Sequence, residues 1–133
     1  MLNAMFMLVL LTNIVMIITA RARVTAVGKG QVQLDYFRLM QGTNVPEFIA
    51  KSTRNFNNLF EVPTLFYAGG AVYLALGLEG SVAVSCAWAF VAARLVHTSI
   101  HLGYNNVLHR LIVFGLGNFA ALLMWIAIMM EAN

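Results

Sequence analysis

Four long apolar stretches, separated by short polar segments, divide the chain. The first covers residues 2–20, the second lies in a helical pattern over 45–78, the third covers 81–103 and the fourth 107–130. A helix needs about 20 apolar residues to cross the ~30 Å hydrocarbon core of a bilayer. The pattern therefore predicts an all-α, integral membrane four-helix bundle that forms a single transmembrane domain over residues 1–133.

The helical pattern over 45–78 is longer than a bilayer requires, since roughly 34 residues correspond to about 50 Å of helix. We expect this helix to start with Asn44 as N-cap, Pro46 in the first turn and Glu47 at the capping-box position. Its first turns should extend into the cytoplasm. Pro63, inside the membrane part, should kink it and free a backbone carbonyl.

The distribution of basic residues predicts the topology. Of the eight Lys and Arg residues, six lie between the first and second apolar stretches, and none lies between the second and third. The positive-inside rule then places the first and third connections in the cytoplasm and both termini outside. In a bacterial inner membrane both termini would be periplasmic. The basic residues form no single patch, so we expect no nucleic-acid partner.

Composition narrows the class further. Hydrophobic residues make up 61% of the chain and charged residues 10%, which excludes a water-soluble globular protein. Cys86 is the one cysteine, so an intrachain disulfide and a cysteine-based metal site are excluded.

Three polar side chains share one face of the third predicted helix. Arg94, His97 and His101 are spaced i, i+3 and i+7 within an otherwise apolar stretch. Such groups are costly in a membrane unless they face protein or water, and by default they mark a functional site.

The second predicted helix carries a matching polar stripe formed by Arg54, Asn58 and Glu61. At 1.5 Å per residue, Glu61 lies about 5 Å and Arg94 about 13 Å below the cytoplasmic boundary, so these two side chains can pair. Arg110 opens the fourth helix at the same level. The sequence thus predicts a cytoplasm-facing pocket whose arginines favour a ligand with carboxylate or phosphate groups. A thiol beside Arg110 would have its pKa lowered.

Simpler interpretations remain open for these residues. In the simpler interpretation, a Glu61–Arg94 pair is no more than a structural clasp between helices. The histidines are then no more than interhelical hydrogen-bonding groups. The spacing of His97 and His101 also suits a metal ion, with His109 or Glu61 as a third ligand. Because no Glu-bearing or repeated histidine motif accompanies it, we expect no metal site.

Two motifs resemble a known family. The run RNFNNLFEVPTLFY at 54–67 resembles the Arg-x-x-x-Asn-x-x-Glu-x-x-Pro signature of the MAPEG family, membrane-associated proteins in eicosanoid and glutathione metabolism, and is most similar to bacterial-type members. Arg94-x-x-His97, followed by Leu102-Gly103 and then Arg110, is similar to the family's third helix and its connection to the fourth. Together the motifs place the resemblance over essentially the whole chain.

The resemblance implies a four-helix protomer, usually a homotrimer, that binds glutathione between neighbouring subunits on the cytoplasmic side. It assigns Arg110 to stabilising the glutathione thiolate. It assigns glutathione contacts to Arg54, Asn58, Glu61, Arg94 and His97, and more loosely to Arg21, while His101 stands where eukaryotic members often have tyrosine.

Two functions follow from this interpretation. The first is a glutathione-dependent transferase or peroxidase that takes a hydrophobic small-molecule substrate from the membrane lipid. The alternative is a non-catalytic membrane subunit of a larger complex, or a lipid-binding protein.

Overall fold

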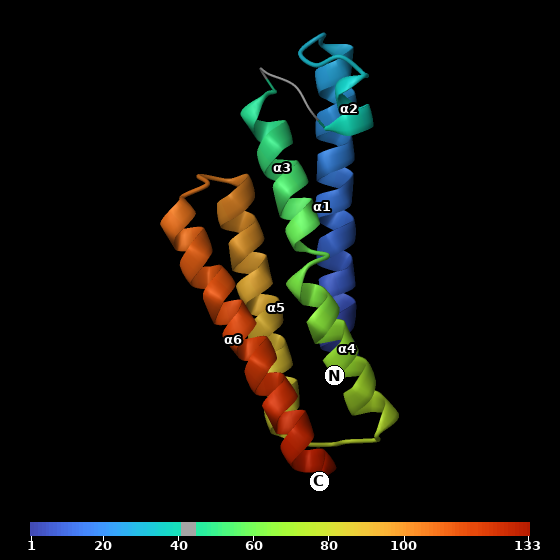
Figure 1. The fold of residues 1–133 in the computed structure, drawn as a ribbon, viewed down its shortest axis with the longest axis vertical. Coiled ribbons are helices and arrows are strands. Elements are labelled where there is room, and N and C mark those ends of the chain that lie inside the picture. The colour runs from blue at the N-terminus through green and yellow to red at the C-terminus, as the bar shows by residue number, and fades with distance from the viewer. Residues whose placement is uncertain (41–44) are drawn as a thin grey trace.

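The computed structural model describes residues 1–40 and 45–133. This part of the chain is all-α, as predicted, and forms an elongated bundle (Figure 1). Asn44, the predicted N-cap, lies outside the described residues. The helices are α1 (Leu2–Gly28), α2 (Tyr36–Leu39), α3 (Glu47–Asn58), α4 (Val62–Ala75), α5 (Ser81–Leu102) and α6 (Val107–Ala132).

Three of these helices, α1, α5 and α6, are each long and apolar enough to cross a membrane. The shorter α3 and α4 follow one another along the bundle and occupy the fourth position (Figure 1). Both termini lie at the end of the bundle where α4 connects to α5 (Figure 1). The α5–α6 connection, residues 103–106, lies at the opposite end, which we call the basic end because Lys51, Arg54 and Arg110 belong to it.

The expected continuous helix over 45–78 is divided at residues 59–61. Pro63 has no N–H to donate, and its ring would collide with the carbonyl of residue 59 if the helix continued. Instead Leu59 and Phe60 donate their N–H groups to Phe56 and Asn57, and Glu61 becomes the N-cap of α4. A proline expected to kink the helix therefore separates it into two.

The first helix also differs from its expected end at residue 20, since α1 continues to Gly28. Arg23 Nη2 donates a hydrogen bond to Thr53 Oγ1 (3.1 Å), and Ala26 is buried in a small cluster with Ile49 of α3. The basic residues mark the expected membrane boundary but do not stop a helix. The helix ends where Gly30 adopts a φ of +65°.

Two adjacent glycines bring helices into close contact, as their small size predicts. A Cβ added to Gly69 would lie 2.7 Å from Cε of Met124 on α6, and one added to Gly70 would lie 2.7 Å from Sδ of Met5 on α1. The main core continues from these contacts through Phe66 of α4. The ring of Phe66 stacks on that of Phe90 of α5, with centroids 4.7 Å apart.

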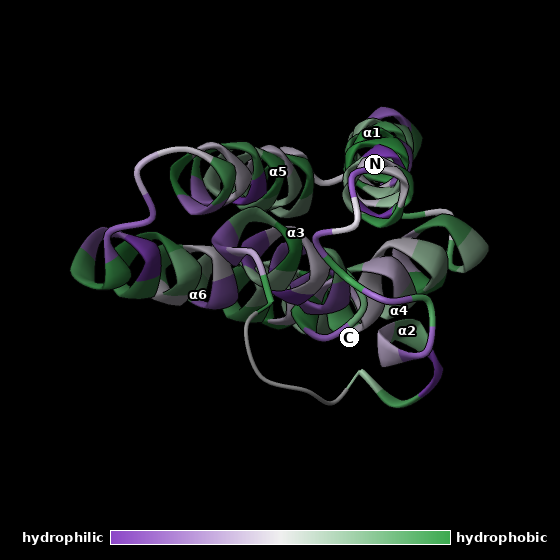
Figure 2. Cartoon of the chain, turned by 90° about the horizontal axis from the view of Figure 1, so that it is seen from above, coloured by the Kyte–Doolittle hydropathy of each residue, from purple (hydrophilic) through white to green (hydrophobic). Residues whose placement is uncertain are grey.

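The outer faces of the long helices are apolar as well. Hydrophobic colouring recurs around their circumference in Figure 2, and large side chains such as Phe6, Ile14 and Leu116 are exposed. A helix that is hydrophobic all round is typical of a membrane environment.

A carboxylate near the C-terminus closes the end of the bundle opposite the basic end. Glu131 Oε1 accepts hydrogen bonds from the backbone N–H groups of Glu79 (3.0 Å) and Gly80 (2.7 Å), at the start of α5. A Cβ at Gly80 would collide with this carboxylate. A negative charge at a helix N-terminus is favourable, and charge-assisted hydrogen bonds are stronger than neutral ones.

We therefore expect Glu131→Ala to lower the stability of the detergent-solubilised protein by about 1–3 kcal/mol, because two charge-assisted hydrogen bonds are lost. Thermal unfolding measures the change. Glu79→Ala is the matched control, since the Glu79 side chain is exposed and only its backbone contacts Glu131. Equal melting temperatures for the two variants would contradict this role of Glu131.

Candidate functional site

Two consecutive asparagines directly precede the helix that carries Arg110. The side chain of Asn106 caps α6, its Oδ1 accepting from the N–H of His109 (3.0 Å). The side chain of Asn105 accepts from Arg110 Nη1 (2.6 Å). Arg110 is half-buried, and its Nε is buried without a hydrogen-bond partner among the described residues.

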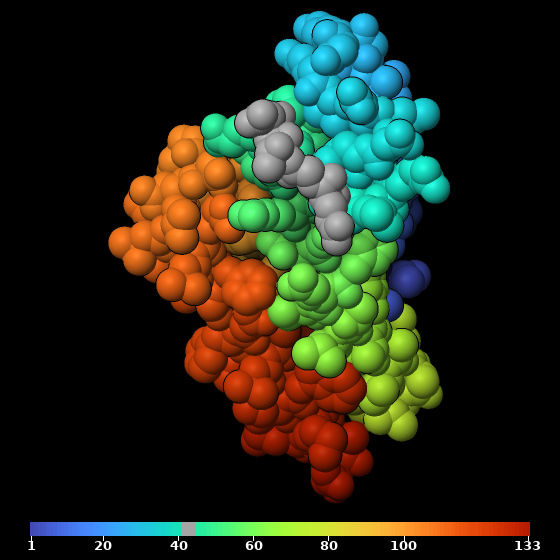
Figure 3. Space-filling model, turned by 45° about the horizontal axis from the view of Figure 1, so that its top comes forward, coloured from blue at the N-terminus to red at the C-terminus, as the bar shows by residue number. Residues whose placement is uncertain are grey.

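Helix α3 adds cations to the same end. Lys51 Nζ donates to the carbonyl of Gly103 (3.1 Å) and ties α3 to the α5–α6 connection. Arg54 follows one turn later and is exposed. Lys51, Arg54 and Arg110 all lie within electrostatic range of the His101 ring. Figure 3 shows α3 and the start of α6 on the same face of the molecule.

The guanidinium of Arg94 lies in the interior, with only 1% of the residue exposed. Its Cζ is 5.0 Å from the ring centroid of Phe90 and 4.8 Å from that of Phe114. Gly117 of α6 packs against it: a Cβ there would lie in ordinary van der Waals contact, 3.6 Å from Nη2, so a longer side chain would collide with the guanidinium. None of the three guanidinium nitrogens has a hydrogen-bond partner in residues 1–40 and 45–133. Two aromatic faces therefore hold this charge.

The predicted ion pair between Glu61 and Arg94 is wrong for the single chain. Within the described residues the one ion pair joins Asp35 to Arg38. Glu61 is exposed, because the break before α4 places it at the surface as an N-cap, and Asn58 just before the break is half-buried. Arg94 meanwhile packs inward against the rings.

The two histidines of α5 are buried beside Arg94. His97 and His101 are 3% and 1% exposed, and their rings meet edge to face with centroids 5.6 Å apart. Neither ring nitrogen of His101 has a partner among the described residues, and neither does Nδ2 of the buried Asn55. Thr98 Oγ1 donates to Asn55 Oδ1 (3.4 Å) and joins α5 to α3.

Buried polar atoms are nearly always hydrogen-bonded, so the unpaired atoms of Arg94, His101 and Asn55 require an explanation. The described residues contain no cluster of three His, Cys, Asp or Glu side chains able to hold a metal ion. The unpaired atoms of Arg94 and Asn55 are donors, which suits a ligand or solvent rich in oxygen acceptors.

Arg21 lies apart from the other candidates. It is exposed on α1 and lines a cavity of about 400 Å³ together with Gln31 and Phe48.

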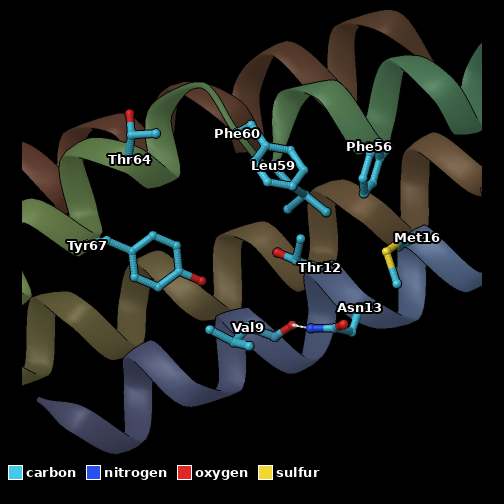
Figure 4. Close-up of a pocket in the computed structure, with 9 residues that line it drawn as sticks. All are labelled: Val9, Thr12, Asn13, Met16, Phe56, Leu59, Phe60, Thr64 and Tyr67. Atoms are coloured by element: carbon cyan, nitrogen blue, oxygen red, sulfur yellow. Dashed lines mark hydrogen bonds between the residues drawn. The ribbon is translucent and has the colours of Figure 1, made fainter.

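A second cavity lies between α1 and the junction of α3 with α4 (Figure 4). Its volume is about 400 Å³, and the hydroxyls of Thr12 and Tyr67 point toward it from opposite helices. Thr12 Oγ1 and Asn13 Nδ2 donate to carbonyls of their own helix, each at 2.9 Å. The lining is Val9, Thr12, Asn13, Met16, Phe56, Leu59, Phe60, Thr64 and Tyr67. A mainly apolar wall with a few polar groups is typical of small-molecule sites.

Sequence reasoning missed three residues of the basic end. Asn105, within the α5–α6 connection, contacts Arg110; Lys51 contacts the same connection at Gly103; and Asn55 contacts Thr98 of α5. The pair of asparagines directly before an apolar helix was the available signal, since asparagine favours both caps and left-handed turns.

Comparison with known proteins adds one finding. A family model described as the MAPEG family matches residues 1–130. No curated protein and no solved structure matches the chain.

The contact between Gly117 and Arg94 generates a test. Gly117→Leu should displace the guanidinium from between its rings and lower detergent stability by about 1–3 kcal/mol, the usual cost of overpacking. Gly115→Leu is the matched control, because a Cβ at Gly115 meets nothing within 4 Å. Thermal unfolding compares them, and an equal effect of both substitutions would rule out a specific fit at Gly117.

Proposed function

Because the chain belongs to the MAPEG family, we propose that the protein is a membrane-bound glutathione-dependent transferase or peroxidase. Members of this family are mostly glutathione-dependent enzymes and are typically trimeric membrane proteins. In this proposal residues 1–133 form one transmembrane domain, with the basic end facing the cytoplasm and both termini periplasmic.

The observation that carries the proposal is the excess of donors at the basic end. Arg54 and Arg110 reach the surface there, while Arg94, His101 and Asn55 hold unpaired polar atoms behind them. Glutathione has two carboxylates, which guanidinium groups bind bidentately. It also has an amine, which suits a carboxylate such as Glu61.

The proposed glutathione-binding residues fall into two groups, one that reaches the surface and one that is buried. Arg54, Asn58 and Glu61 reach the surface of the single chain and are the direct contacts. The buried members of the set, Arg94, His97 and His101, lie behind this surface, and Arg21 on α1 is available to a neighbouring subunit of a homotrimer.

Arg110 is the proposed catalytic residue. Bound glutathione supplies the thiol, whose thiolate is the nucleophile, and a neighbouring cation favours the thiolate. A half-buried guanidinium is screened less than a fully exposed one, so its charge acts more strongly on a bound anion.

The hydrophobic substrate would enter from the bilayer into the cavity of Figure 4. That cavity opens at the break between α3 and α4, near the proposed direct contact Glu61. The apolar lining suits a hydrocarbon body, and the hydroxyls of Thr12 and Tyr67 suit a polar substituent on it.

One observation favours the alternative of a non-catalytic or lipid-binding membrane subunit. Arg94 is enclosed by Phe90, Phe114 and Gly117, so in the single chain its charge serves the packing of α5 on α6. A protein that needed its polar residues only for packing would bind no glutathione.

The proposed role of Arg110 is tested with glutathione and the purified protein in detergent. The parent should bind glutathione and show the ultraviolet absorption of a thiolate below the ordinary thiol pKa of about 8.5. Arg110→Ala should remove most of that absorption and the turnover while changing glutathione affinity much less. Arg110→Lys should substitute only in part, since an ammonium lacks the planar fork.

Arg38→Ala is the control, because Arg38 is exposed and pairs with Asp35 away from the basic end. If calorimetry detects no glutathione binding to the parent at millimolar concentration, the enzyme proposal fails and the membrane-subunit alternative replaces it.

The substrate cavity has its own test. Thr12→Phe should fill the space between α1 and the α3–α4 junction and raise the KM for an apolar electrophile roughly tenfold or more. Glutathione binding should not change. Ile14→Phe, on the exposed face of the same helix, should leave both constants unaltered. Equal KM values for the two variants would move the substrate site elsewhere.

A further inference from the structure

The acceptor that holds Arg110 is neutral. Asn105 Oδ1 accepts from Arg110 Nη1 at 2.6 Å, and no carboxylate of the described residues pairs with this arginine. The bond therefore orients the guanidinium without cancelling its charge.

The position of Asn105 is fixed by its backbone. Its N–H donates to the carbonyl of Ile100 (2.8 Å), which joins it to the last turn of α5, and its φ is +54°. Asparagine tolerates this left-handed conformation better than most residues. Arg110 is fixed from the other side, because its own N–H donates to the carbonyl of Asn106 at the start of α6 (3.1 Å). The hydrogen bond between Asn105 and Arg110 thus joins the end of α5 to the start of α6.

The other polar groups of the connection are engaged elsewhere. The hydroxyl of Tyr104 and Nδ1 of His109 bond to each other (2.9 Å), and the side chain of Asn106 caps α6. Lys51 reaches the backbone of Gly103. Asn105 is consequently the one side chain of the described residues that contacts the Arg110 guanidinium through a hydrogen bond.

We propose that Asn105 is a positioning residue for Arg110, which holds the guanidinium with a neutral acceptor so that its whole positive charge remains available to a bound thiolate. This inference rests on the proposed function. A guanidinium has five N–H donors, and the bond to Asn105 uses only one of those on the two terminal nitrogens. An aspartate at the same position would keep the geometry but would oppose the charge.

Three substitutions separate these effects. Asn105→Gly keeps the left-handed backbone and removes the acceptor. Asn105→Asp keeps an acceptor and adds a negative charge. Asn106→Ser is the matched control, since serine caps a helix as well as asparagine does. Asn106 bonds to Arg110 only through the two backbones, which the substitution leaves in place.

The measurements are the thiolate absorption of bound glutathione against pH, and kcat and KM for glutathione. With Asn105→Asp the midpoint of thiolate formation should rise by about one pH unit or more, which leaves about tenfold less thiolate at any pH well below it. The kcat should fall in proportion and recover as the pH is raised. Asn105→Gly should lower kcat severalfold with little change in KM, and Asn106→Ser should match the parent.

Other ionisable groups face this end, namely Lys51 and Arg54 on α3, His101 on α5 and His109 on α6. They are the same in every variant, so a midpoint that moves only in Asn105→Asp reports the added charge. If the parent forms thiolate and the two Asn105 variants have its midpoint and its kcat, the positioning role alone is overturned. If the parent forms no thiolate, both this role and the proposed function are overturned.

Discussion

Placing a guanidinium inside an apolar bundle without a direct ion pair is the constraint on which much of the structure depends. A buried ion loses its hydration, at a cost of several kcal/mol that its surroundings must offset. Here the faces of Phe90 and Phe114 supply that compensation, and Gly117 packs beside the guanidinium. The close packing of α5 on α6 follows, because the three residues that enclose Arg94 come from both helices.

The fold was largely predictable because its main determinant is the length and spacing of apolar stretches. All-α architecture, the paired glycines at Gly69 and Gly70 and membership of a four-helix membrane family were confirmed. The division of the second helix was not, since hydropathy is blind to a local clash of the Pro63 ring with the backbone. The continuation of α1 to Gly28 was missed because it depends on a hydrogen bond between Arg23 and Thr53, far apart in the chain.

The arrangement of the candidate site residues was only partly predictable from the sequence. Helical spacing identifies which side chains share a face, and Arg94, His97 and His101 do lie together. Spacing does not show whether a long side chain turns inward to aromatic rings or outward to an acid, so the Glu61–Arg94 pair was wrong. The contact of Asn105 with Arg110 was not predictable, because it depends on the left-handed turn between α5 and α6.

The break at residues 59–61 has a mechanical consequence. Because Phe56 belongs to α3 while Thr64 and Tyr67 belong to α4, the wall of the cavity that faces α1 in Figure 4 consists of two helices joined by three residues. Rotation about a few backbone torsions at this junction would change the distance between that wall and α1 without unfolding either helix. Where α4 meets α1, the contact of Gly70 is with the side chain of Met5, and methionine adapts its shape readily, whereas Gly69 lies against both Met124 and Trp125 of α6. Such a movement would let this cavity accept ligands of different width.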